Sequence, residues 1–140
     1  MICHCHRMRL IPLILMALLL PTLPAQAQSA LTAEGFDAYT KGKTLYYGFE
    51  GKPYGVERYL DGRRVIWSFL DGNCKNGVWY EENGQICFLY EDQIDPQCWT
   101  FSQGPGGLIA RFENNPESTD LYEAQDIGEK MLCYGPEVGV

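Results

Sequence analysis

Cysteine and histidine are the residues of this chain best suited to metal binding and to nucleophilic catalysis. The chain has six cysteines and two histidines, and the run Cys3-His4-Cys5-His6 holds both histidines. Its alternating spacing differs from the gaps of roughly two to four residues between zinc-finger ligands. Residues 28–140 therefore contain no imidazole that could activate a serine or cysteine nucleophile. From the sequence we expect no metal, no cofactor and no enzymatic activity.

The N-terminal segment has the parts of a secretory signal. Arg7 and Arg9 precede the apolar run Leu10–Leu20, and the small residues Ala25 and Ala27 follow it. This order predicts a signal peptide that is cleaved after Ala27. The alternative, a membrane anchor, needs roughly 20 apolar residues, and this run is shorter and interrupted by proline.

Cleavage would divide the chain into a signal peptide, residues 1–27, and a single domain, residues 28–140. Translation could instead begin at Met8, because Arg9 would still supply a basic start. We expect a periplasmic or secreted monomer with no membrane span after cleavage. In such an oxidising compartment, four cysteines in a short chain predict two disulfides. These cysteines are Cys74, Cys87, Cys98 and Cys133.

The net charge expected after cleavage of the signal peptide makes some classes of partner improbable. The full chain has a formal net charge of −7, and loss of Arg7 and Arg9 makes it −9. Such a chain repels phosphates, so we expect neither nucleic acid nor an anionic lipid surface as a partner.

One short helix and a series of strands must position any site. Thr32 can cap a helix over residues 32–41, and Gly42 can end it. Short aromatic and β-branched runs separated by turn residues follow, which is typical of strands. The predicted strands are Thr44–Phe49, Tyr54–Leu60, Arg63–Phe69, Gly77–Glu81, Gln85–Glu91, Gln97–Ser102 and Gly107–Glu113.

The connections between these runs are too short for crossover helices, so neighbouring strands should be antiparallel. Asp61-Gly62 and Asn83-Gly84 tolerate the positive φ of tight hairpin turns. The sequence thus predicts an all-β fold: a small antiparallel meander that forms a barrel or a curled sheet of seven or eight strands.

The register of one hairpin follows from its side chains. When Gln85–Ser102 folds back on itself, Cys87 lies opposite Cys98 and Ile86 lies opposite Trp99. Ile86, Phe88 and Tyr90 then share a face with Trp99 and Phe101. This arrangement favours a Cys87–Cys98 disulfide and leaves Cys74 to pair with Cys133. The two other connectivities stay open at this point.

Two patterns resemble known families. Gly55-Val56, Tyr59 and Asp61-Gly62 correspond, about 22 residues later, to Gly77-Val78, Tyr80 and Asn83-Gly84, a spacing that resembles MORN-type repeats. The order Gly77-Val78-Trp79, Cys87 and Cys98-Trp99 resembles small secreted bacterial domains of unknown function. That resemblance implies an exported β-domain and carries no activity.

The aromatic side chains are the feature best suited to binding. Exposed aromatics on a sheet can stack on sugars or anchor a protein, although in a small barrel they can also form the core. The candidate binding face consists of Tyr46, Tyr54, Tyr59, Trp67, Trp79 and Trp99.

These observations favour a non-enzymatic binding module of the bacterial envelope, with a protein or glycan as its partner. One alternative is an inhibitor of a cationic enzyme such as lysozyme, suggested by the acidic charge. The other is a hydrolase that uses paired carboxylates, which is the less favoured alternative because the acids lie beside hairpin turns. The acids concerned are Glu81, Glu82, Glu91, Asp92 and Asp95.

Overall fold

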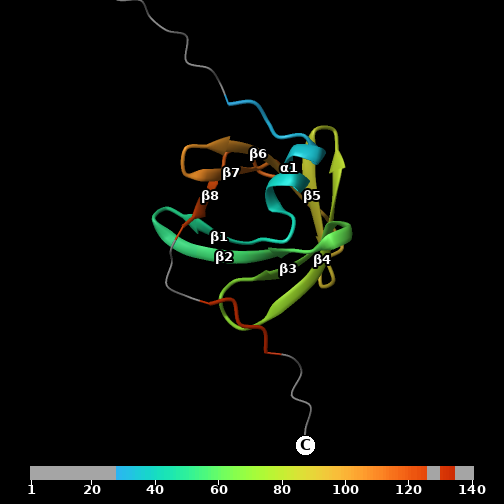
Figure 1. Cartoon of the computed structure of the whole chain (residues 1–140), viewed down its shortest axis with the longest axis vertical. Coiled ribbons are helices and arrows are strands. Elements are labelled where there is room, and N and C mark those ends of the chain that lie inside the picture. The colour runs from blue at the N-terminus through green and yellow to red at the C-terminus, as the bar shows by residue number, and fades with distance from the viewer. Residues whose placement is uncertain (1–27, 126–129, 135–140) are drawn as a thin grey trace, which may run out of the picture.

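The computed structural model describes residues 28–125 and 130–134, so the predicted signal peptide lies outside the described residues. One helix and eight strands follow in order (Figure 1). Their bounds are α1 Ala33–Thr40, β1 Thr44–Phe49, β2 Lys52–Tyr59, β3 Arg64–Ser68, β4 Cys74–Glu82, β5 Gln85–Tyr90, β6 Gln97–Gly104, β7 Gly107–Phe112 and β8 Leu121–Ala124. A 3₁₀ turn, Asp61–Arg63, joins β2 to β3. Among the described residues, the structure contains no apolar helix of the length that spanning a bilayer requires.

The strands form a closed antiparallel barrel in which each strand pairs with its neighbour in sequence. Closure comes from the pairing of β1 with β8, where Tyr46 lies opposite Ala124 and Gly48 opposite Tyr122. The predicted all-β meander is confirmed, and the structure is a barrel rather than an open curled sheet. β8 was not among the predicted strands, because its four residues are too few to show a clear alternation.

The turn between β4 and β5 and the N-terminal cap of α1 lie at the residues that the sequence predicts. Asn83 and Gly84 have φ of 52° and 76° in the turn between β4 and β5. The Thr32 side chain accepts a hydrogen bond from the Gly35 N–H at 3.1 Å and so caps α1. Gly42, with φ of 77°, follows the helix.

The register predicted for the hairpin of β5 and β6 is also present. Ile86 pairs with Trp99 and Cys87 with Cys98. Cys87 and Cys98 form a disulfide across this pair, and Cys74 and Cys133 form a second one. Two disulfides are typical of proteins that fold outside the reducing cytosol.

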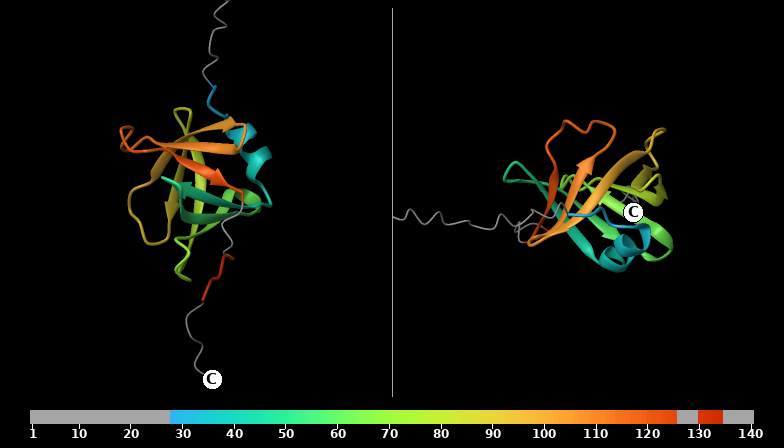
Figure 2. Two further views of the ribbon diagram at one scale, coloured as in Figure 1. Left: turned by 90° about the vertical axis from the view of Figure 1, so that its left-hand side faces the viewer. Right: turned by 90° about the horizontal axis from the view of Figure 1, so that it is seen from above.

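Helix α1 closes one end of the barrel. Phe36 is completely buried, and its ring centroid lies 4.5 Å from that of Phe101, 5.1 Å from Trp79 and 5.7 Å from Tyr59. The right-hand view of Figure 2 shows α1 at one end and the connection between β7 and β8 at the other. The aromatic density of the sequence therefore supplies the packing of the closed end.

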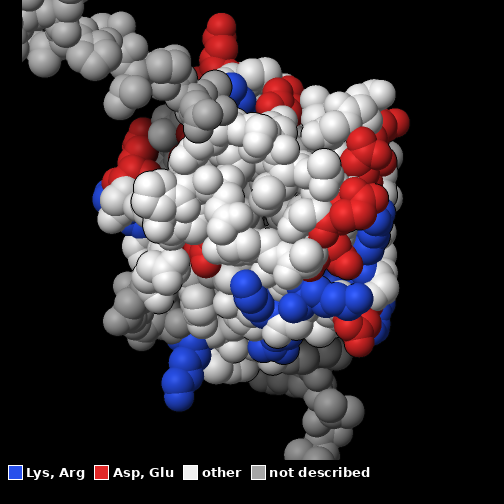
Figure 3. Space-filling model, turned by 45° about the horizontal axis from the view of Figure 1, so that its top comes forward, with Lys and Arg blue, Asp and Glu red and all other residues white. Residues whose placement is uncertain are grey.

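Charged side chains are unevenly distributed over the outside. On the face drawn in Figure 3, acidic side chains gather along one edge, basic side chains lie beside them, and most of the remaining surface is uncharged. Ion pairs of the described residues join Lys75 to Asp92 at 2.6 Å and Arg111 to Asp120 at 3.6 Å.

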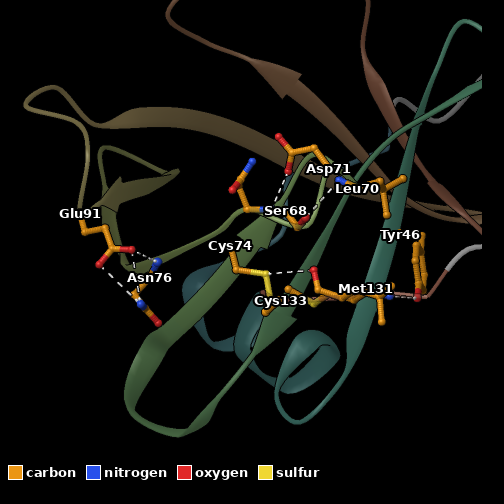
Figure 4. The surroundings of a disulfide bond; sticks show 11 residues. Tyr46, Ser68, Leu70, Asp71, Cys74, Asn76, Glu91, Met131 and Cys133 are labelled. Atoms are coloured by element: carbon orange, nitrogen blue, oxygen red, sulfur yellow. Dashed lines mark hydrogen bonds between the residues drawn. A yellow bond between two sulfur atoms is a disulfide. The ribbon is translucent and has the colours of Figure 1, made fainter. Parts of the chain in front are cut away.

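The C-terminal residues 130–134 run across the outside of the barrel and form what we call the strap. The strap crosses an outward-facing row of paired residues on β1 to β4: Tyr46, Val56, Ser68 and Cys74. Met131 N–H donates to the Tyr46 hydroxyl at 3.2 Å, and Cys133 is bonded to Cys74 (Figure 4). Val56 and Ser68 lie between these two attachments and are fully buried although they face outward.

Candidate functional site

The end of the barrel opposite α1 opens into a pocket of about 80 Å³. Burial increases from its rim to its base. Tyr54 and Phe69 at the rim are 37% and 46% exposed, whereas Glu57 and Tyr59 at the base are each 1% exposed. β-Barrel mouths are a common place for small-molecule sites, so this pocket is the candidate functional site.

Two inward-facing glycines make room for the pocket's aromatic walls. A Cβ atom on Gly55 would lie 2.3 Å from the Trp67 ring, and one on Gly77 would lie 2.7 Å from the Tyr90 ring. Each ring therefore occupies the space beside a glycine of the neighbouring strand, where a side chain would clash with it. These two glycines are the corresponding glycines of the 22-residue repeat, so each copy of the repeat supplies one such position.

A cluster of polar side chains lies at the base of the pocket. The Tyr90 hydroxyl lies 3.0 Å and 3.2 Å from the two carboxyl oxygens of Glu57 and donates to them. Beside them, the hydroxyls of Tyr47 and Tyr59 are hydrogen-bonded at 2.7 Å. All four side chains are buried and line the same pocket.

Burial dominates the electrostatics of this cluster. It raises the pKa of Glu57 well above the ordinary value of 4.5, and the hydrogen bond from Tyr90 only partly opposes this. Burial also raises the pKa of Tyr90 and of Tyr59, and the nearby Glu57 raises both further. Desolvation penalises every charged form here, so the empty pocket favours a neutral carboxyl group and neutral phenols.

Lys75 and Asp92 lie at the rim. Lys75 is the one basic side chain among the described residues that line the pocket, and its ammonium group is paired with Asp92 at 2.6 Å. The same ammonium lies 5.6 Å from the centre of the Phe69 ring. The Lys75 charge is therefore held at the entrance rather than at the Glu57 carboxyl group.

The titration of Glu57 should make the stability of the protein depend on pH. The pKa of Glu57 in the folded protein is raised above its ordinary value of 4.5. The neutral carboxyl group therefore contributes fully to stability below pH 4.5, and this contribution is lost as the pH rises through the folded-state pKa. Between pH 4.5 and the folded-state pKa of Glu57, we expect the free energy of unfolding to fall by about 1.4 kcal/mol per pH unit. Urea unfolding of wild type and Glu57→Gln between about pH 4 and about pH 9 measures it. A difference between the two proteins that stays constant with pH would contradict the prediction.

The six aromatic residues of the predicted binding face lie in three different places in the structure. Tyr54, Tyr59, Trp67 and Trp99 line the pocket. Trp79 lies at the closed end, 5.1 Å from Phe36 and beneath the guanidinium of Arg63. Tyr46 faces the outside and holds the strap.

Sequence reasoning did not single out Glu57, its hydrogen-bond partner Tyr90 or the neighbouring Tyr47 as site residues. A signal for Glu57 was present, because its position alternates in phase with Tyr59 and so must share the inward face. The proximity of Glu57 to Tyr90 had no local signal, since these residues are 33 positions apart.

Glu81, Glu91 and Asp92, three of the five acids considered for hydrolysis, have structural contacts. Glu81 accepts the Gly84 N–H in the turn at one end of β5, and Glu91 accepts the Asn76 N–H at the other end. One group of three possible metal ligands occurs among the described residues, Glu82 with Cys87 and Cys98, but its two sulfurs are bonded to each other.

No protein-family model, curated protein or solved structure matches this chain. The resemblance to small exported domains therefore stays a prediction, and the geometry of the pocket carries the functional argument.

Proposed function

We propose that this protein is an exported, non-enzymatic binding module whose barrel holds a small molecule, or the end of a larger one such as a glycan. The observation that carries the proposal is the pocket itself: an opening with aromatic walls and a buried polar cluster at its base. Such a combination of apolar walls and a few placed polar groups is typical of ligand sites. A periplasmic or secreted location belongs to this proposal and rests on the predicted signal peptide.

The dimensions of the pocket limit what can enter. Its volume of about 80 Å³ is roughly half that of an engineered cavity that accepts benzene. A ligand must therefore be very small or insert only one group. Tyr54 and Phe69, which are exposed at the rim and whose ring centres are 5.7 Å apart, would contact the part that stays outside.

A fragment screen tests the proposal. We expect some members of a library of neutral, cationic and anionic fragments to shift the NMR signals of pocket residues in the processed, disulfide-bonded protein. Ala110 lies buried in the wall, so Ala110→Leu should fill the pocket and weaken these fragments at least about tenfold. Val78→Leu on the exposed outer surface is the matched control and should leave the affinities unchanged.

Fragments that bind Ala110→Leu as well as wild type would refute a site in the barrel. If Ala110→Leu loses its dispersed amide spectrum, Leu121→Phe blocks the same pocket from another strand.

The alternative of inhibiting a cationic enzyme rests on the net charge of −9 expected for residues 28–140. The acidic edge seen in Figure 3 is the kind of surface that steers a cationic partner. Inhibition of a cationic enzyme stays a prediction, since Tyr54 and Phe69, which line the rim of the pocket, are aromatic and the rim acid Asp92 is paired with Lys75.

A further inference from the structure

The Glu57 carboxyl group has fewer partners than its chemistry allows. Once ionised, a carboxyl group offers about four lone-pair sites, whereas Glu57 receives one hydroxyl donor, Tyr90, that spans both of its oxygens. Glu123, an acid near the closed end, is different. It accepts from the Tyr39 hydroxyl at 2.7 Å and from the Leu108 N–H at 2.9 Å. Glu123 thus ties the barrel to α1, whereas Glu57 lines the pocket and keeps acceptor capacity that no other side chain of the described residues uses.

The surroundings of Glu57 suit a positive charge. The side chains of Tyr47, Tyr59 and Tyr90 line the pocket together with Glu57, and aromatic rings attract cations. Among the described residues that line the pocket, the sole cation is Lys75, which is already paired with Asp92 at the rim. Among the described residues, the base of the pocket therefore has an acid and aromatic side chains but no basic side chain beside them.

Resting on the proposed function, we propose that the ligand is a small organic cation whose ammonium group enters the pocket, pairs with Glu57 and packs against the surrounding tyrosine rings. An ammonium ion supplies the charge that a buried carboxylate lacks, and the aromatic walls favour it over its neutral isostere. An anionic ligand would face Glu57 without a free counter-ion. A neutral, hydrogen-bonding ligand is the competing outcome of the test.

Binding of such a cation should release a proton. Burial opposes ionisation of Glu57 in the empty pocket, and its pKa is raised accordingly. A bound ammonium ion stabilises the carboxylate, so Glu57 loses its proton to solvent as the cation enters. The phenols of Tyr47 on β1, Tyr59 on β2 and Tyr90 on β5 also face this site. Their pKa values are raised above 10, so they stay neutral. Lys75 on β4 stays paired with Asp92.

Two matched pairs of probes test the inference in the processed protein by titration calorimetry. Choline is compared with 3,3-dimethylbutan-1-ol, its neutral isostere, and butylamine with butan-1-ol. We expect at least one cation to bind about tenfold or more tightly than its isostere. Repeating the titration in buffers of different ionisation enthalpy should show proton release, and the affinity should rise with pH through the folded-state pKa of Glu57.

Glu57→Gln keeps the size of the side chain but cannot ionise. It should abolish the preference for the cation and the proton release, while the affinity of the neutral alcohol stays within about threefold. Glu50→Gln, an exposed acid in the turn between β1 and β2, changes the net charge equally and should have no effect.

The outcomes separate the two proposals. Equal affinity for cation and alcohol, or a preference that survives in Glu57→Gln, overturns the cation inference and leaves a small-molecule site in place. The cation inference also fails if none of the four probes binds while neutral fragments of the screen occupy the pocket. If neither the probes nor any fragment binds there, the proposed function fails as well.

Discussion

Phe36→Ala should lower the free energy of unfolding by about 3–5 kcal/mol, the usual cost of truncating a buried aromatic side chain. Phe36 is fully buried and packs edge-on against Tyr59, Trp79 and Phe88 while also contacting Phe101. Because these rings come from four strands and cannot all move inward, a cavity should remain at the closed end. Urea unfolding at constant pH measures the loss.

Asp37→Ala on the same helix is the control for this experiment. Asp37 contributes a long ion pair to Lys41, at 3.9 Å, which is partly exposed and worth little. We expect a change within about 0.5 kcal/mol. A loss below about 1 kcal/mol in Phe36→Ala would show that α1 does not close the barrel as the structure describes.

Removal of the disulfide that holds the strap should have a comparably large effect. The Cys74→Ala/Cys133→Ala double variant opens a loop between residues 59 positions apart. The loop-entropy relation then predicts a loss of about 4 kcal/mol. Val56 and Ser68 are buried in the row between the two attachments of the strap, so we expect its release to expose these side chains of β2 and β3.

Thermal and urea unfolding of the double variant, under non-reducing conditions, measure this loss. Leu132→Ala changes a half-exposed residue of the same strap without cutting its covalent link, and should cost about 0.5 kcal/mol or less. Equal stability of wild type and the double variant would mean that the strap contributes nothing to the fold.

The hairpins could be predicted from sequence because the forces that form them act between residues close in the chain. Asn83-Gly84 adopts the positive φ of a tight turn on its own account, and Cys87, Cys98 and the apolar alternation around them all select one register. The 22-residue repeat of glycines was visible in the same way. The sequence did not show that these glycines leave space for the Trp67 and Tyr90 rings, because that depends on which ring the neighbouring strand places beside each glycine.

The pocket could be predicted only in part. Aromatic composition pointed to Tyr54, Tyr59, Trp67 and Trp99, which do line it. The same reasoning included Tyr46 and Trp79, which lie under the strap and at the closed end. Residue type does not distinguish a core aromatic from a pocket aromatic, because the difference lies in which end of the barrel is covered.

By itself, the sequence determined a short capped helix, an antiparallel meander, two disulfides and the register of the hairpin that carries one of them. Only the tertiary structure decided that β1 pairs with β8, that α1 closes one end, and that Glu57 lies against Tyr90 at the base of an open pocket. Turns and alternation are properties of adjacent residues, whereas closure of the barrel joins strands from opposite ends of the domain. The burial of an acid with a single hydrogen-bond donor, Tyr90, is a consequence of that closure.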